Sequence, residues 1–261
     1  MRRGMGISML LCLLSVWAWA QYGYNPLALH PILEDDIMFR RTVTRIINLR
    51  EKQNKPFAAQ NHHIAEEIIL AVDSGYVTAY FPSIDGSVEV LLSDSAWRSA
   101  VAERDDIDIY ENMRMDPSNI SVLEITEEVV FDKRRSRMYI NILTLTLVAP
   151  GYNRQVKTEE NDLPIARFKY KELAEYFRKK YEESNQTRCL WYNPQNNRRH
   201  MCLTDAFELR LFSSRIVKIS NPDDKFIHSY PELKGNVEAQ LYKSREIEYE
   251  LMEFEHNLWE F

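Results

Sequence analysis

Glycine is scarce in this sequence, with 7 in 261 residues. Loops that bind phosphate groups through their backbone need several glycines close together, and no stretch of the sequence offers one. The G-x-S-x-G pattern of serine hydrolases and the H-E-x-x-H pattern of zinc peptidases are missing as well. These absences remove the common motifs for nucleotide binding and hydrolysis. The sequence therefore offers no recognisable motif for catalysis, and we expect no cofactor.

Positive charge is also in short supply. Lys and Arg number 33 against 39 Asp and Glu, which gives a net charge of −6 at pH 7. Residues 1–20 have a basic start, an apolar middle and an Ala-Trp-Ala end, which is the pattern of a cleavable secretory signal. Cleavage would remove Arg2 and Arg3 and change the net charge from −6 to −8. An acidic mature chain is not attracted to nucleic acid or to anionic lipid, so we expect neither as a partner.

Long apolar runs are confined to this leader. A membrane anchor is the alternative to a signal, but the apolar stretch at 5–20 is short for a bilayer core of about 30 Å. No later stretch is apolar enough to span a membrane as a helix. We therefore predict an exported mature chain without a membrane span.

Cysteine occurs 3 times, and only Cys189 and Cys202 lie outside the leader. The segment between them has strand-like ends and a turn-rich centre at 193–197, which predicts a β-hairpin. A hairpin folded about 195 and 196 places the two cysteines opposite each other, close to disulfide distance. Because an exported protein meets an oxidising compartment, we predict a Cys189–Cys202 disulfide. The alternative is two reduced, buried thiols, and both roles are structural.

Helical and strand patterns alternate along the rest of the chain. The segment RMYINILTLTLV at 137–148 alternates at period two, and with 120–131 it predicts a long hairpin closed by a charged turn at 132–136. Local hairpins, rather than strand–helix–strand units, predict an α+β fold of antiparallel hairpins with flanking helices and a long C-terminal helix. Shorter strands are expected at 76–81 and 88–92, and helices at 34–54, 62–74, 93–104, 170–183, 204–216 and 236–258.

The domain organisation follows from the length. About 240 residues remain after the signal, which allows one large domain or two small ones. We predict a signal peptide at 1–20, an extended segment at 21–33 and one α+β domain at 34–261. The polar stretch near 150–165 is the candidate internal boundary.

The best metal-like pattern is HHIAEE at 62–67. On a helix, His62 and Glu66 would be neighbours, as would His63 and Glu67. A catalytic metal site usually needs three protein ligands, and no third is evident. We therefore predict no metal site and interpret the pattern as a solvated helix start. Adjacent acids elsewhere, such as the pair at 127 and 128, are also expected to be solvated.

The C-terminal helix carries an apolar stripe. Four apolar side chains between 247 and 258 recur at i, i+4, i+7 and i+11, and two aromatic residues follow at the end of the chain. The stripe either packs on its own domain or docks on a neighbouring subunit. Docking is the sharper hypothesis, because chain ends fray unless they are held. The candidate docking residues are Ile247, Leu251, Phe254, Leu258, Trp259 and Phe261.

Four stretches carry a family resemblance that runs along nearly the whole mature chain. They are DDIMFRRTVTRIINLREKQNKPF (35–57), FDKRRSRMYINILTL (131–145), DAFELRLFSSRIVKISN (205–221) and FEHNLWEF (254–261). Together they resemble the GldN/PorN family, the gliding-motility and type IX secretion component of Bacteroidota. The match is weakest at 58–63 and 150–165.

The resemblance implies a periplasmic, non-enzymatic protein at the inner face of the outer membrane. It implies a hetero-oligomeric ring with the lipoprotein GldK/PorK and contact with a GldM/PorM-like motor protein. Such a system exports cargo across the outer membrane, and in some members it powers gliding. Two other classes stay open. A soluble periplasmic binding protein would need a concave pocket with convergent polar groups, and a cell-envelope hydrolase would need a cleft with clustered acids.

Overall fold

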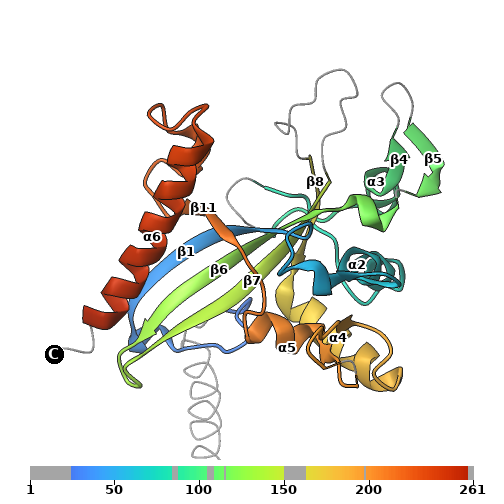
Figure 1. Cartoon of the computed structure of the whole chain (residues 1–261), viewed down its shortest axis with the longest axis horizontal. Coiled ribbons are helices and arrows are strands. Elements are labelled where there is room, and N and C mark those ends of the chain that lie inside the picture. Colours follow the sequence, from blue (N-terminus) through green and yellow to red (C-terminus); the bar gives the residue numbers. More distant parts are fainter. Residues whose placement is uncertain are drawn as a thin grey trace, which may run out of the picture.

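The computed structural model describes residues 25–83, 88–104, 109–114, 116–149, 163–196 and 198–257. Five strands form one antiparallel sheet in the order β11-β1-β6-β7-β8 (Figure 1). The predicted signal peptide at 1–20 and most of the predicted boundary, at 150–162, lie outside the described residues. The strands of the sheet are β1 (Ile37–Asn48), β6 (Val122–Asp132), β7 (Arg137–Ala149), β8 (Leu163–Lys169) and β11 (Arg215–Ile219).

Five α-helices occur in the described part of the chain, and α6 is the long C-terminal one. Together with the sheet they make the predicted α+β fold. In Figure 1, α2, α4 and α5 gather at one end of the sheet, whereas α6 lies at the other, where it packs on β11. No helix among the described residues is long and apolar enough to cross a membrane. The helices are α2 (Ile64–Asp73), α3 (Asp94–Ala100), α4 (Tyr170–Glu183), α5 (Leu203–Glu208) and α6 (Val237–Asn257).

Short elements connect these units. They form three two-stranded ladders and several single turns of 3-10 helix. The paired strands are β2 (Ala58–Ala59) with β3 (His62–His63), β4 (Ala102–Arg104) with β5 (Ile109–Arg114), and β9 (Leu190–Trp191) with β10 (Met201–Cys202). The 3-10 turns are η2 (Glu34–Asp36), η3 (Lys55–Phe57), η4 (Pro117–Asn119) and η5 (Ile227–Ser229).

The long hairpin predicted from alternation is confirmed as β6 and β7. Its charged turn is held by Asp132, whose side chain is buried. The carboxylate accepts hydrogen bonds from the backbone N–H groups of Arg134 and Arg135 at 2.8 and 3.1 Å. It also pairs with the Arg135 guanidinium at 2.7 Å. An acid at this position therefore accepts hydrogen bonds from the backbone N–H groups of the turn, as short polar side chains commonly do.

One face of the sheet carries two separate hydrophobic clusters. β1 and β6 pair continuously from Phe39 opposite Phe131 to Asn48 opposite Val122, so the odd-numbered side chains of both strands share that face. The first core lies against α2, α4 and α5 and includes Ile47, Leu123, Ile68, Leu173 and Phe207. The second core lies against α6 and comprises Val43, Val129, Ile216, Ile227, Ile247 and Leu251.

The helix predicted at 34–54 is wrong. After one 3-10 turn, Ile37–Asn48 is strand β1, which pairs with β6 on one side and β11 on the other. Apolar residues in this segment also fit helical spacing, but five of the six residues at 42–47 are β-branched. Such side chains favour a pleated strand, and pairing on two sides overrides a weak helical pattern.

Two further predictions need correction. The helix predicted at 204–216 ends at Glu208, because Arg210 adopts φ 53° and the chain turns there into β11. The segments predicted as strands at 76–81 and 88–92 contribute two isolated bridges, between Tyr80 and Leu91 and between Tyr80 and Arg167 of β8. By contrast, α2, α4 and α6 form where helices were predicted. The helix predicted at 93–104 forms as α3 but ends at Ala100, before strand β4.

Candidate functional site

A buried carboxylate lies between the two cores. Glu127 projects from β6, and its side chain is 0% exposed. Its Oε2 accepts a hydrogen bond from Nε of Arg45 at 3.0 Å. Arg210, which follows α5, donates from Nη1 to Oε1 at 2.7 Å and from Nη2 to Oε2 at 3.2 Å. Strand pairing and the turn after α5 thus bring two guanidinium groups onto one acid.

The same network reaches the C-terminal helix. Nη1 of Arg45 donates to Oε1 of Glu248 on α6 at 2.8 Å. Two carboxylates, Glu127 and Glu248, therefore balance the charge of two guanidinium groups. Arg45 contacts both acids. A buried ion pair adds little net stability compared with apolar packing, but losing one partner is expensive. We infer that the network fixes where α6 sits on the sheet.

An open groove runs between α6 and this part of the sheet. Its volume is about 590 Å³. Arg45 and Arg210 contribute to its polar side, together with Ser213 and Ser214. Three charged side chains of α6 also line it, namely Arg245, Glu248 and Glu255. Its apolar lining comes from Val129, Met138, Ile140, Phe212, Tyr249, Leu251 and Met252.

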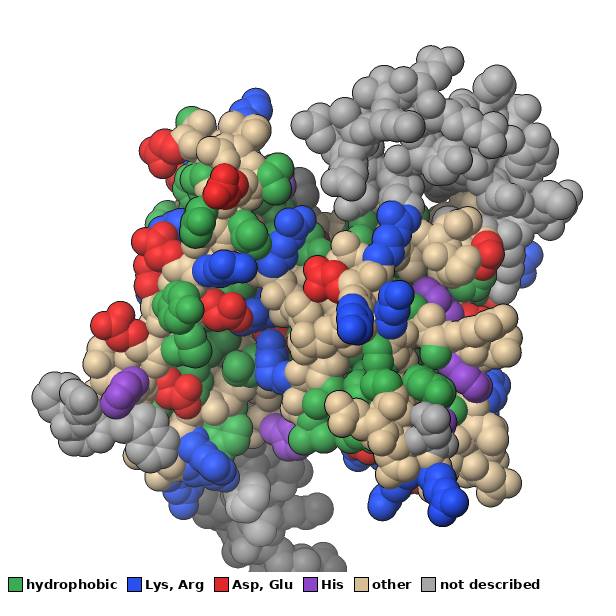
Figure 2. All heavy atoms as spheres, viewed as in Figure 1, with side chains coloured by type: hydrophobic (Ala, Val, Ile, Leu, Met, Phe, Trp, Pro, Cys, Tyr) green, Lys and Arg blue, Asp and Glu red, His purple; other side chains and the backbone are tan. Residues whose placement is uncertain are grey.

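A second hollow of about 700 Å³ adjoins α6 and shares Arg245 and Tyr249 with the first. Leu233, Ala239 and Tyr242 add apolar surface to it. In Figure 2, hydrophobic side chains gather over α6, with both acidic and basic side chains around them. The exposed ridge of α6 is therefore the surface that both hollows border.

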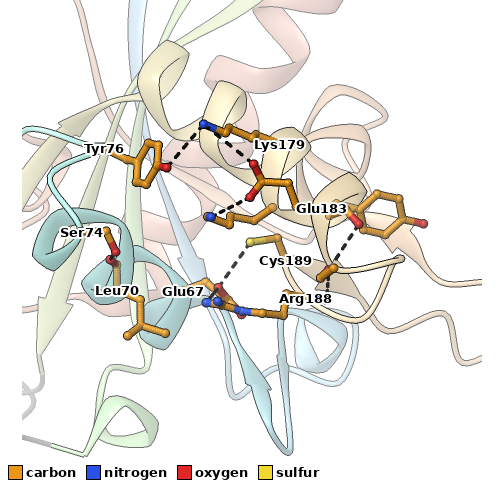
Figure 3. A network of polar contacts seen from close by, with 11 residues as sticks. Glu67, Leu70, Ser74, Tyr76, Lys179, Glu183, Arg188 and Cys189 are labelled. Atoms are coloured by element: carbon orange, nitrogen blue, oxygen red, sulfur yellow. Dashed lines mark hydrogen bonds and ion pairs between the residues drawn. The ribbon is translucent and has the colours of Figure 1, made fainter.

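A second polar network joins α2 to the segment after α4 (Figure 3). Glu67 is buried and accepts two hydrogen bonds from Arg188, from Nε at 3.2 Å and from Nη2 at 2.7 Å. The Cys189 thiol donates to the same carboxylate, with Sγ and Oε2 3.4 Å apart. The contacts satisfy a buried acid and tie two helical units together.

The predicted hairpin between the cysteines exists, but its register differs by one residue from the prediction. Cys202 lies opposite Leu190, and Met201 lies opposite Trp191. Cys189 precedes the strand in a left-handed conformation, φ 50°, which directs its thiol toward Glu67. Both thiols are free and buried in this structure. The Cys189–Cys202 disulfide stays a prediction.

The reduced thiols should be unreactive in the folded chain. Burial raises the pKa of both thiols, and the Glu67 carboxylate raises that of Cys189 further. Since the thiolate is the reactive form, alkylation of the native protein at pH 7.5 should be at least about tenfold slower than in urea. The buried neutral thiols make their full contribution to folding stability below about pH 8.5, the usual thiol pKa in an unfolded chain. The contribution falls as the pH rises above that value, because the unfolded chain then releases its thiol protons more readily than the folded chain.

Timed alkylation followed by intact mass measurement checks this prediction. The protein is reduced first, and a parallel sample without reductant reports whether a disulfide is present. Equal alkylation rates for native and unfolded protein would contradict the burial of the thiols.

The metal-like pattern serves as a helix cap. His62 and His63 form β3, and α2 begins after them, where Nδ1 of His63 accepts a hydrogen bond from the Ala65 N–H at 3.2 Å. Burial lowers the pKa of His63. The pattern is not fully solvated, because Glu67 is buried against Arg188. Within the ranges that the structure describes, no group of three or more His, Cys, Asp or Glu side chains could hold a metal.

The apolar stripe of α6 packs on the chain's own sheet. Ile247 and Leu251 are buried in the second core, and the ring of Phe254 lies 4.3 Å from that of Phe39. This packing is the first of the two interpretations of the stripe. Docking of the chain's end on a neighbour stays a prediction, and Leu258, Trp259 and Phe261 lie outside the described residues.

The charged network around Glu127 was not predicted from the sequence. Glu127 and Glu128 were expected to be solvated, yet both are buried. The available signal was the position of charged residues within apolar strand segments, TRII for Arg45 and ITEEVVF for Glu127. A charge on the core-facing side of a strand requires a buried partner.

A comparison with protein families decides which family the chain represents. The family described as gliding motility associated protein GldN matches residues 32–260. The chain belongs to the GldN family. The match covers both cores and the charged network, so the fold described above is that of a GldN-type, gliding-motility-associated protein. A search of curated proteins found no match.

Proposed function

We propose that this GldN-family chain is a non-enzymatic structural component of the type IX secretion system. It resides in the periplasm at the inner face of the outer membrane and forms a ring with a GldK/PorK-like lipoprotein. It also contacts a GldM/PorM-like motor protein, and the assembly supports protein export and gliding. The observation that carries the proposal is the family match over residues 32–260.

The geometry is suited to a scaffold. α6 is anchored by the second core and by the Arg45–Glu248 pair, so its outer side is a fixed surface. Each hollow described above is open and adjoins this helix. No observation in the described residues favours the binding-protein or hydrolase alternative over the scaffold.

Co-expression with the GldK/PorK-like lipoprotein of the same species tests the proposal. The lipoprotein carries the affinity tag, and the purified material is imaged by negative stain. We expect co-purification in rings or stable hetero-oligomers. An unrelated outer-membrane lipoprotein with the same tag is the control. A chain that stays monomeric and never associates with its own lipoprotein would overturn the ring, and ligand screening of the monomer would follow.

A further inference from the structure

The outer face of α6 carries a second seam, separate from the buried stripe. Tyr242, Arg245, Tyr249 and Met252 follow one another at intervals of three, four and three residues. This is the 3.5-residue period of a coiled-coil seam. Tyr242, Tyr249 and Met252 are 62%, 67% and 52% exposed. Three large apolar side chains therefore stand in solvent along one line of the helix.

The helix that presents this seam is rigidly mounted. Ile247 and Leu251 fix its inner face in the second core, and Glu248 pairs with the buried Arg45. The seam runs from Tyr242 to Met252 within this 21-residue helix, which is about 15 Å or roughly three helical turns of contact. Docking on it would need no rearrangement of the domain.

The charges beside the seam indicate the kind of partner. Six glutamates lie on α6, against one lysine and one arginine. Glu246 pairs with Lys243 and Glu248 with Arg45. Glu250, Glu253 and Glu255 make no salt bridge within the described part of the chain. Along α6 itself, the seam consists of three apolar side chains and Arg245, and the charges beside it are mainly glutamates. This acidic excess on the helix complements a basic partner helix.

A second copy of this chain is a poor occupant. Two α6 helices packed through the same seam would bring acidic flanks together, and like charges across such a seam are destabilising. A helix with an apolar seam and lysine or arginine flanks would pair with the glutamates instead.

We propose that the outer face of α6 is a docking surface for a basic amphipathic helix of a partner protein, gripped through Tyr242, Tyr249 and Met252. Arg245 lies within the seam and selects a polar or acidic residue at the facing position. This inference goes beyond the ring proposal, since it specifies a partner's chemistry whichever protein supplies the helix.

Two synthetic peptides test the proposal against the full mature chain. Both have the same leucine and isoleucine heptad seam, but one has lysine flanks and the other glutamate flanks. Fluorescence anisotropy should show binding of the lysine peptide at least about tenfold tighter than that of the glutamate peptide. The difference should shrink as salt increases, because exposed charges are screened.

Paired variants locate the contact. Tyr249→Ala with Met252→Ala should weaken binding of the lysine peptide at least about tenfold without lowering the melting temperature, because both side chains are exposed. Leu209→Ala, 62% exposed at the end of α5, is the matched control and should change nothing. Glu250→Lys with Glu253→Lys should reverse the preference toward the glutamate peptide.

Three results would overturn the docking surface: no binding of either peptide, equal binding of both, or unchanged affinity in the Tyr249 and Met252 variant. None of them bears on the ring, which is tested by co-purification with the lipoprotein. Rings that form with that variant as they do with the natural chain would leave the scaffold role intact and place the ring contact elsewhere.

Discussion

Glu127→Gln should lower the free energy of unfolding by about 3–5 kcal/mol, the usual loss when one partner of a buried ion pair is removed. The carboxylate is fully buried and accepts three hydrogen bonds from Arg45 and Arg210. With a neutral amide at 127, Arg210 has no acid left in the described network. Arg45 keeps one acidic partner, Glu248. Uncompensated positive charge then remains between the two cores.

Urea denaturation of the natural chain and the variant measures the loss. Glu34→Gln is the matched control, because Glu34 pairs with Arg40 at 2.7 Å at the exposed end of the same sheet. An exposed pair contributes at most about 1 kcal/mol, so the control should stay near the natural stability. If Glu127→Gln cost no more than Glu34→Gln, the network would not be the anchor of α6.

Phe207→Ala should destabilise the chain by about 3–5 kcal/mol, as expected for the loss of a buried phenyl ring. Phe207 projects from α5 into the first core and is 1% exposed. Its ring centroid lies 5.1 Å from that of Phe57 and 5.7 Å from those of Tyr170 and Phe212. Four aromatic rings from three segments thus share one cluster, and removing the central ring leaves a cavity.

Thermal and urea unfolding of Phe207→Ala give the measurement. Leu209→Ala lies two residues along the chain and is exposed, so it should stay within about 0.5 kcal/mol of the natural protein. A Phe207→Ala loss as small as that of the control would mean that the first core can collapse around the missing ring.

Because the two clusters are separate from each other on the sheet, the two losses should report on different parts of the molecule. Glu127→Gln weakens the junction with α6, whereas Phe207→Ala weakens the packing of α2, α4 and α5. Hydrogen exchange in α6 should therefore increase more, relative to the total loss of stability, in Glu127→Gln than in Phe207→Ala.

Local pattern was sufficient for part of the fold. The alternation at 137–148 and the charged turn before it predicted β6 and β7, because a strand with one buried face must alternate and a tight turn needs polar side chains. Helix α4 forms at 170–183 as its apolar spacing indicated. The α+β class follows from such local units alone.

Only the tertiary structure decided the remainder. Ile37–Asn48 became a strand because β6 and β11 pair with both of its edges, and those partners lie far away in the sequence. The prediction that Glu127 is solvated was wrong for the same reason, because its partners are also distant in the sequence. Its two arginines come from β1 and from the turn after α5. Burial and charge compensation depend on which segments pack together. The periodicity within one segment does not indicate which distant segment it will contact. The sequence by itself therefore determined the long β6–β7 hairpin and helices such as α4 and α6. Long-range pairing decided that 37–48 is a strand and which faces are buried, and it left the outer face of α6 exposed.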